Sequence, residues 1–254
     1  MRSDYSLMNK MIAGFSAPGP TADGASADRV LGRLASERPV DLPEAPAPGL
    51  SLRETFDRRS SSLSYGTDGL FLTDQLTALR QALRQDRDDW GEAAASVPLE
   101  GFVFALRSID LAPGIYRVDA DGAARVGELP APEHWDELGV QKEFAAAGAI
   151  VSVAVDLDRA DSWAGTHGYR VAMARAAGAI YDLHLSSVAH GLVGTVFAGF
   201  IPASVRHVLH SDGASRHQMF AMTVAPPPAR EASWAQPPRP VASALKEPVG
   251  AARS

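Results

Sequence analysis

The sequence predicts an α+β fold, with one ordered domain over residues 49–232. The run Ala149–Val155 is apolar and β-branched on both faces, which is typical of a central strand. The run Tyr169–His190 is rich in alanine and has a wide apolar face, and Gly191 follows it as a C-cap, so it predicts the longest helix. Helices and strands alternate irregularly along the chain, which favours the α+β class.

The other elements follow from local signals. A capping box at Ser51 and Glu54 predicts a short helix that ends near Phe56. Thr73 is expected to cap a second helix over Asp74–Leu83. A polar loop is expected over 86–92, a largely helical segment over Pro132–Ala147, and strands over Phe102–Leu106, Ile115–Val118, Ala124–Val126, Thr195–Phe200 and Met219–Ala225.

Both ends of the chain have a composition that cannot bury enough apolar surface to offset the entropy of ordering. Residues 1–48 are rich in Ala, Pro, Gly, Ser and Asp, and they predict a flexible N-terminal arm. Residues 233–254 are rich in Pro and Ala and predict a disordered tail.

Composition excludes several classes of protein. A formal net charge of -6 argues against binding to nucleic acid, and the absence of cysteine excludes disulfides and thiolate chemistry. No apolar run is long enough to cross a membrane, and Asn9 and Lys10 interrupt any signal-peptide core. No pattern of histidines and carboxylates completes a metal site. We expect a cytoplasmic protein.

The segment Asp57–Ser62 combines two adjacent arginines with three serines. Guanidinium groups fit the geometry of a phosphate, and serine hydroxyls can donate to its remaining oxygens. Taken alone, however, such a segment is more often a solvated basic turn than a phosphate site.

Five segments in chain order resemble one known family. They are Arg58-Arg59-Ser60, Pro98 through Arg117, Gly168-Tyr169-Arg170, Val196–Phe200 and Pro228-Ala229-Arg230. The second is the most specific, because Pro98-Leu99-Glu100 and Leu111-Ala112-Pro113-Gly114-Ile115-Tyr116 match several residue types over one continuous stretch. Together the segments resemble the flavin-dependent nitroreductase-like superfamily, and within it the SagB-type dehydrogenases that oxidise azoline rings in ribosomal peptides.

The resemblance implies a mixed sheet flanked by helices, with FMN bound at a homodimer interface. It implies that Arg58, Arg59 and Ser60 hold the FMN phosphate, with Arg230 as a further cation. Backbone N–H groups of Ala198 and Gly199 would face the flavin ring, where a glycine allows close approach.

The chain departs from the family in the region that supplies a Lys-Tyr pair, since residues 161–167 contain no lysine. His167 or Tyr169 is the hypothesis for a substitute proton acceptor. A further arginine after Arg59 and the usual small-residue flavin loop before Pro98 are also absent.

The predicted function is an FMN-dependent dehydrogenase that converts thiazoline or oxazoline rings of a precursor peptide to thiazoles or oxazoles, with a cyclodehydratase complex as partner. Two alternatives stay open. One is a nitro or quinone reductase that uses NAD(P)H, and the other is a degenerate, non-catalytic member that binds peptide or acts as a structural subunit.

Overall fold

The computed structural model describes residues 38–198, 206, 209, 211 and 214–229. The predictions at Gly199, at Arg230 and over most of the two chain ends lie outside these residues. The elements are β1 (Arg38–Val40), α2 (Leu52–Arg58), α3 (Leu72–Ser96), β2 (Glu100–Ala105), β3 (Gly114–Val118), β4 (Ala123–Gly127), η1 (Pro132–Glu137), η2 (Lys142–Ala146), β5 (Ala149–Val155), α4 (Leu157–Ala164), α5 (Thr166–Ala189), β6 (Val196–Phe197) and β7 (His217–Val224).

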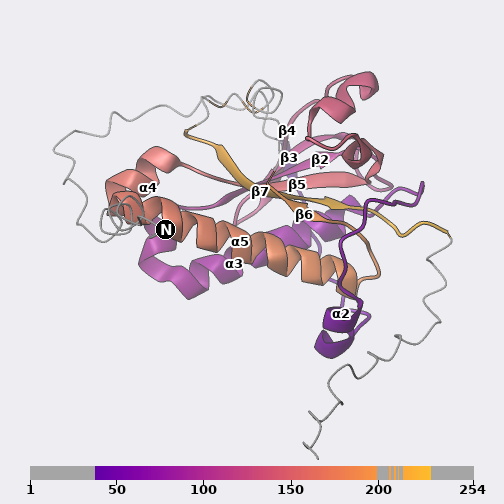
Figure 1. Ribbon diagram of the computed structural model, residues 1–254, viewed down its shortest axis with the longest axis horizontal. Coiled ribbons are helices and arrows are strands. Elements are labelled where there is room, and N and C mark those ends of the chain that lie inside the picture. The colour runs from indigo at the N-terminus through magenta and orange to yellow at the C-terminus, as the bar shows by residue number, and fades with distance from the viewer. Residues whose placement is uncertain (1–37, 199–205, 207–208, 210, 212–213, 230–254) are drawn as a thin grey trace, which may run out of the picture.

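Seven strands form one sheet in the order β1-β4-β3-β2-β5-β7-β6. All pairings between these strands are antiparallel, and within the described residues a parallel pairing occurs as an isolated bridge between Leu70 and Ser108. Strand β5 is an inner strand between β2 and β7, and each of its residues is buried, as its sequence predicts. The α+β class and a sheet flanked by helices are therefore confirmed (Figure 1).

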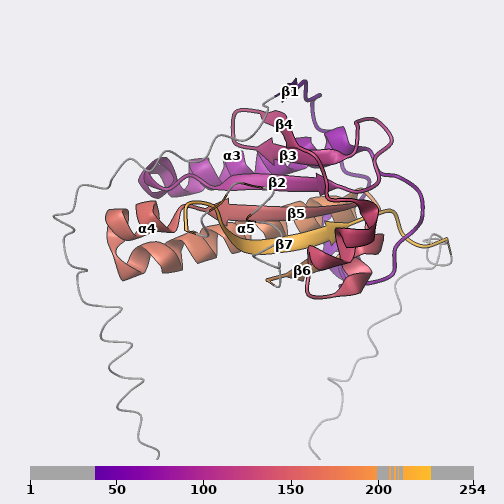
Figure 2. The same ribbon diagram turned by 90° about the horizontal axis from the view of Figure 1, so that it is seen from above.

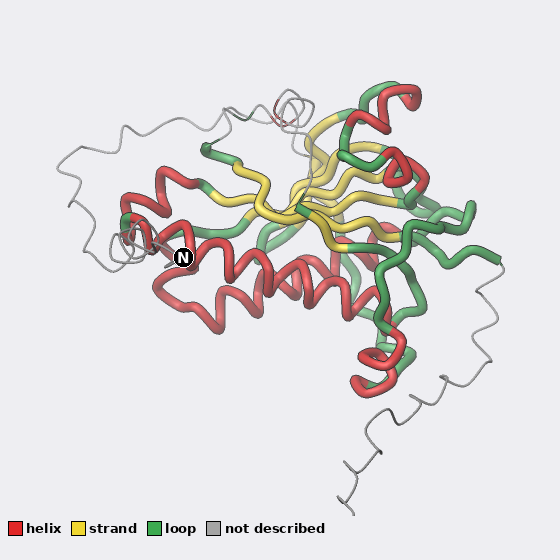
Figure 3. The backbone as a smooth tube through the Cα atoms, viewed as in Figure 1, coloured by secondary structure: helices red, strands yellow, loops and turns green. Residues whose placement is uncertain are grey.

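The sheet separates two apolar cores. Helices α3 and α5 lie side by side on one face, where their leucines, isoleucine and alanines pack against Val103, Val151 and Val153 (Figures 1 and 2). The opposite face carries Phe102, Phe104 and Ile150, and the 3₁₀ helices η1 and η2 help to cover it (Figure 3). Alternate residues of β2 and β5 thus point into different cores. No helix among the described residues is long and apolar enough to cross a bilayer.

Helix α3 is much longer than predicted, and the loop expected over 86–92 is wrong. Gly91 has non-helical backbone angles, φ 45° and ψ -109°, so α3 consists of two helical segments that meet at a kink there. Asp86 points inward to Arg175 of α5, so a residue that looks like part of a polar loop is held in the helix by a buried ion pair.

Helix α4 has no counterpart in the sequence prediction, and two other segments differ from it. Helix α4 follows β5 directly, with the Asp156 side chain accepting from the backbone N–H of Arg159 as its N-cap. The segment Pro132–Ala147 forms two short 3₁₀ helices with a break between them. Residues 38–40, which lie in the predicted arm, pair with β4 as an edge strand.

Candidate functional site

The Arg58-Arg59-Ser60 motif lies at the C-terminal end of α2. Ser51 caps this helix, and its side chain and the Glu54 side chain form the predicted capping box. Arg58 ends the helix, and the backbone N–H of Arg59 donates to the carbonyl of Thr55 at 2.8 Å. Both arginines are partly exposed and Ser60 is exposed, so their donors are accessible to a ligand.

The segment after the motif is tied to the link between α5 and β6. The N–H of Ser62 donates to the carbonyl of Gly194 at 2.9 Å. Gly194 has no room for a side chain, because a Cβ there would overlap the carbonyl oxygen of Thr223 on β7. The Thr223 hydroxyl in turn pairs with the Tyr65 hydroxyl at 2.9 Å. The motif is thus fixed against the end of the sheet.

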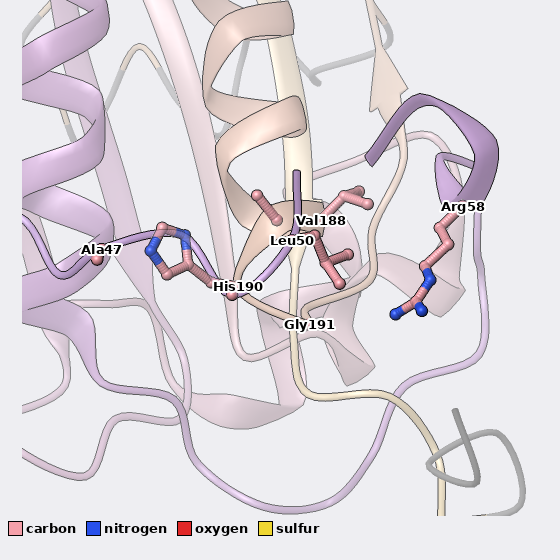
Figure 4. A pocket seen from close by; sticks show the side chains of 8 residues that line it. Ala47, Leu50, Arg58, Val188, His190 and Gly191 are labelled. Carbon is pink, nitrogen blue, oxygen red and sulfur yellow. The ribbon is translucent and has the colours of Figure 1, made fainter. Parts of the chain in front are cut away.

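Arg58 lines a cavity of about 390 Å³ at the C-terminal end of α5. Its walls are Ala47, Gly49 and Leu50 on one side and residues 188–191 on the other. Arg58 and His190 lie on either side of Leu50 and Val188 (Figure 4). Apart from these two side chains the lining is apolar or backbone, so the cavity suits a ligand with an anionic group and an apolar part.

One wall of this cavity belongs to residues 42–49, which we call the N-terminal strap. The strap crosses α3 and α5, with His190 Nε2 at 3.2 Å from the carbonyl oxygen of Pro46 and the N–H of Gly49 donating to Ala189 at 3.0 Å. A second cavity, also of about 390 Å³, lies on the other side of the strap against α3. The strap therefore separates two hollows at the end of α5.

His184 on α5 was not singled out from the sequence as a site residue. Its side chain is 2% exposed, and within the described residues its Nδ1 atom has no hydrogen-bond partner. Burial, reinforced by the positive charge of Arg59, lowers the pKa of His184 below its usual value. Tyr181 lies next to it, with ring centroids 6.1 Å apart. The α5 side of the motif thus carries a neutral, buried imidazole.

Ala198 directly follows β6, whose Phe197 stacks on Phe144 of η2 with ring centroids 4.1 Å apart. Ala198 is exposed, and it is four residues from Gly194, which binds Ser62, a span of about 13 Å for extended chain. This span is an upper limit on the distance between Ala198 and Gly194, and the role of Ala198 stays a prediction.

His167 and Tyr169 lie elsewhere in the chain. Both are exposed and belong to the first turns of α5, whereas the cavity lies at its last turn. Between His167 and Val188 the helix rises about 31 Å, at about 1.5 Å per residue. Within one chain, the structure does not bring these residues together with Arg58 and Arg59.

The residues at the end of α5 fit the phosphate end of FMN. Arg58, Arg59 and Ser60 offer donors of the kind that phosphate oxygens accept, beside a cavity of about 390 Å³. The C-terminal end of α5 carries the negative end of the helix dipole, which would repel an anion. N–H groups of residues 190–192 already donate to the last carbonyls of the helix and weaken this repulsion.

Comparisons with known proteins support the fold. Neither protein-family models nor curated proteins give a match. Among solved structures, a protein from Anabaena variabilis designated a nitroreductase is similar with a TM-score of 0.62 and 20% identity, over 75% of this chain and 42% of that chain. This chain thus spans less than half the length of that protein.

Two further structures are similar over most of their own length. A chain of the Escherichia coli microcin synthetase complex McbBCD, with truncated pro-MccB17 bound, has a TM-score of 0.54 and 15% identity, over 87% of this chain and 91% of that chain. A Ralstonia eutropha protein designated a nitroreductase has a TM-score of 0.51 and 16% identity, over 76% and 98%. At these identities the comparisons establish a nitroreductase-like fold.

Proposed function

We propose that the protein is an FMN-dependent oxidoreductase of the SagB type, which oxidises thiazoline or oxazoline rings of a ribosomal precursor peptide to thiazoles or oxazoles. The observation that carries this proposal is the Arg58-Arg59-Ser60 donor set beside the cavity at the end of α5, in a chain with a nitroreductase-like fold. The similarity to a chain of a synthetase complex that holds a truncated pro-peptide supports a peptide substrate and a synthetase partner.

The chain's own residues would bind and orient the cofactor. Arg58, Arg59 and Ser60 would hold the phosphate, with Arg230 as an added cation. Backbone N–H groups at Ala198 and Gly199 would face the flavin edge and stabilise negative charge there. When bound, FMN supplies the two-electron acceptor for the oxidation, and dioxygen is the terminal oxidant in this proposal.

Conversion of an azoline to an azole removes one hydride and one proton from the ring. The protein must therefore supply a proton acceptor, and His167 and Tyr169 are our candidates. Because they lie about 28–31 Å from the cavity along α5, they would serve the cavity of a second subunit in a homodimer. A cyclodehydratase would make the azoline that this enzyme consumes, and we place both proteins in the cytoplasm.

The first test measures FMN binding. We expect the purified protein to carry FMN, visible in its absorption spectrum. Arg58→Ala and Arg59→Ala should each raise the Kd for FMN about tenfold or more, since a hydrogen bond to a charged group contributes about 1.5–3 kcal/mol. Arg53→Ala is the matched control, because Arg53 is exposed on the same helix, one turn away from the cavity end. Equal FMN occupancy in all three variants would contradict the phosphate assignment.

The second test separates the dehydrogenase from its alternatives. The FMN-loaded protein is incubated with an azoline-containing peptide in air, and mass spectrometry should show the loss of two hydrogens per ring. Rapid bleaching of the flavin by NAD(P)H without azoline oxidation would instead indicate a nitro or quinone reductase. A protein that binds the peptide but neither FMN nor NAD(P)H would be a structural subunit.

A further inference from the structure

The surface between α3 and α5 carries a groove that begins at the N-terminal strap. The second cavity, of about 390 Å³, lies against the strap, and a cavity of about 430 Å³ follows it along the two helices. Both are lined by Ala78, Gln81 and Ser186, so they form one hollow, which we call the α3–α5 groove. Figure 1 shows the two helices side by side.

Helix α3 separates its charged side chains between two flanks. On the flank towards the β3–β4 turn, Arg84 Nε donates to the carbonyl of Ala120 at 2.6 Å and Arg87 pairs with Asp121 at 3.0 Å. Arg80 donates to a carbonyl of the strap at 3.5 Å. Arg84 also lines the groove, but its guanidinium is held by the turn. These three cations therefore have partners outside the groove.

The flank of α3 that faces α5 is acidic. Asp74, Gln81 and Asp88 follow one another at intervals of seven residues, so they lie along one stripe of the helix, and all three line the groove. Asp182 of α5 lines the same cavity as Asp88. Among the residues that the structure describes, these three carboxylates accept no hydrogen bond and form no ion pair. Burial, and then the negative charge of Asp89, raise the pKa of Asp182 above its usual value, a state that an added cation relieves.

A buried amide nitrogen faces the strap end of the groove. Gln75 is 4% exposed and lines the second cavity, and its Oε1 accepts from the Ser187 hydroxyl at 3.2 Å. Its Nε2 has no hydrogen-bond partner within the described part of the chain. The Ser186 hydroxyl, which also lines the groove, has none there either. A buried donor without an acceptor is costly, and a ligand that brings a carbonyl oxygen satisfies it.

We infer that the α3–α5 groove binds an extended polypeptide segment that carries two basic side chains about six residues apart. From Asp74 to Asp88, α3 rises about 21 Å, and an extended chain covers that distance in about six residues. One basic side chain pairs with Asp74 beside the ring of Phe71, which is 56% exposed and lines the same cavity. The other pairs with Asp88 and Asp182. Gln75 Nε2 donates to a main-chain carbonyl of the segment.

Other ligands match the groove less well. A phosphate or an acidic segment meets three carboxylates, and an apolar helix would bury those carboxylates without partners. The inference goes beyond the proposed function and does not rest on it, because the groove lies on the other side of the strap from the cavity that Arg58 lines. Binding in the groove needs neither FMN nor turnover.

The experiment measures binding of labelled peptides to the full chain without FMN, by fluorescence anisotropy. Two peptides of glycine and serine have the same composition and two lysines each, which are about six residues apart in one and about twelve in the other. The first should have a Kd about two- to fivefold lower, the contribution of one exposed ion pair. Equal Kd values, or tighter binding of the widely spaced peptide, would overturn the inference.

Variants identify the carboxylates. Asp74→Asn and Asp88→Asn should each raise the Kd of the closely spaced peptide about two- to fivefold, and in Asp74→Asn the advantage of this spacing should disappear. Glu133→Gln is the matched control, because it removes the same charge from an exposed position on η1, on the other side of the sheet. A Glu133→Gln effect as large as that of Asp74→Asn would show attraction by net charge alone and refute the groove.

Gln75→Met tests recognition of the main chain. Methionine keeps the length of the side chain, and the Ser187 hydroxyl retains the carbonyl of Leu183 at 2.9 Å as its acceptor. The Kd should rise about two- to tenfold for both peptides, because the lost hydrogen bond does not depend on the lysines. An unchanged Kd in this variant, with its thermal midpoint showing that it is folded, would contradict a polypeptide ligand.

Light scattering separates a second copy of the chain from a peptide partner. We expect the mass of the natural protein, Asp74→Asn and Asp88→Asn to be the same. If these variants change the mass and the natural protein binds neither peptide, the groove holds another copy of the chain and the inference is overturned. A protein that binds the peptide but carries no FMN would refute the proposed function alone.

Discussion

Replacing Arg175 by methionine should lower the free energy of unfolding of this protein by a large fraction. The Arg175 side chain is 1% exposed and binds both carboxylate oxygens of Asp86, at 3.0 and 2.7 Å. It also donates to the carbonyls of Ala93 and Val97, at 3.1 and 2.7 Å. Methionine fills much of the volume but leaves the Asp86 carboxylate buried without its cation. Breaking a buried pair in this way costs about 3–5 kcal/mol.

This cost should be measured by denaturant unfolding. For a domain of this size, about 1 kcal/mol corresponds to about 2–4 °C, so the thermal midpoint should fall by about 6–20 °C. Arg87→Met is the matched control, because Arg87 pairs with Asp121 at 3.0 Å on the surface, where such a pair contributes at most about 1 kcal/mol.

A second comparison identifies the cause. The double variant Arg175→Met with Asp86→Leu removes both charges and should regain most of the loss, because a well-packed apolar pair can replace a buried ion pair at little cost. A single variant no less stable than Arg87→Met, or a double variant as unstable as the single one, would refute the reasoning.

Three further predictions concern caps, titration and close packing. Asp110→Ala should cost about 1 kcal/mol near neutral pH, because Asp110 accepts from the N–H groups of Leu72 and Thr73. Burial opposes ionisation of Asp110, but these hydrogen bonds and those from the Thr73 and Ser108 hydroxyls outweigh burial and lower the pKa of Asp110. The cost of Asp110→Ala should therefore disappear as pH falls below about 4 when unfolding is measured at a series of pH values. His184 has a lowered pKa, so the unfolded chain takes up a proton at a higher pH than the folded chain, and stability should fall as pH drops below about 6.5. His184→Phe should reduce this dependence of stability on pH. In Arg59→Ala, an NMR titration should show a higher pKa for His184. Gly194→Ala should cost about 1–3 kcal/mol in denaturant unfolding through its overlap with Thr223, while Gly122→Ala should not, and equal stabilities would contradict the tight contact.

The elements that could be predicted from the sequence are those whose signals are local. The capping box at Ser51 and Glu54, the buried strand Ala149–Val155 and the helix end at Gly191, which has φ 77°, are each specified by neighbouring residues. The phosphate-binding role of the arginine motif differs from these, because it rests on the resemblance of five segments in chain order and stays a prediction.

The parts that could not be predicted depend on residues far apart in the chain. The start of α3 is capped by Asp110, 38 residues beyond Leu72, and not by Thr73. The last turns of α3 depend on Arg175, 89 residues beyond Asp86. His184 resembles any other helix residue in sequence, and its burial beside Arg59 follows only from the packing of α2 on α5.

The position of β7 has a consequence for synthesis of the chain. Strand β7 lies between β5 and β6 although it is the last strand of the sheet in sequence. Until residues 217–224 leave the ribosome, β5 has one unpaired edge along a strand whose residues are apolar except for Ser152. Such an edge is a template for pairing with other chains. Nascent chains that stop before His217 should therefore aggregate or require a chaperone, while β2, β3 and β4 can already have formed as neighbouring hairpins.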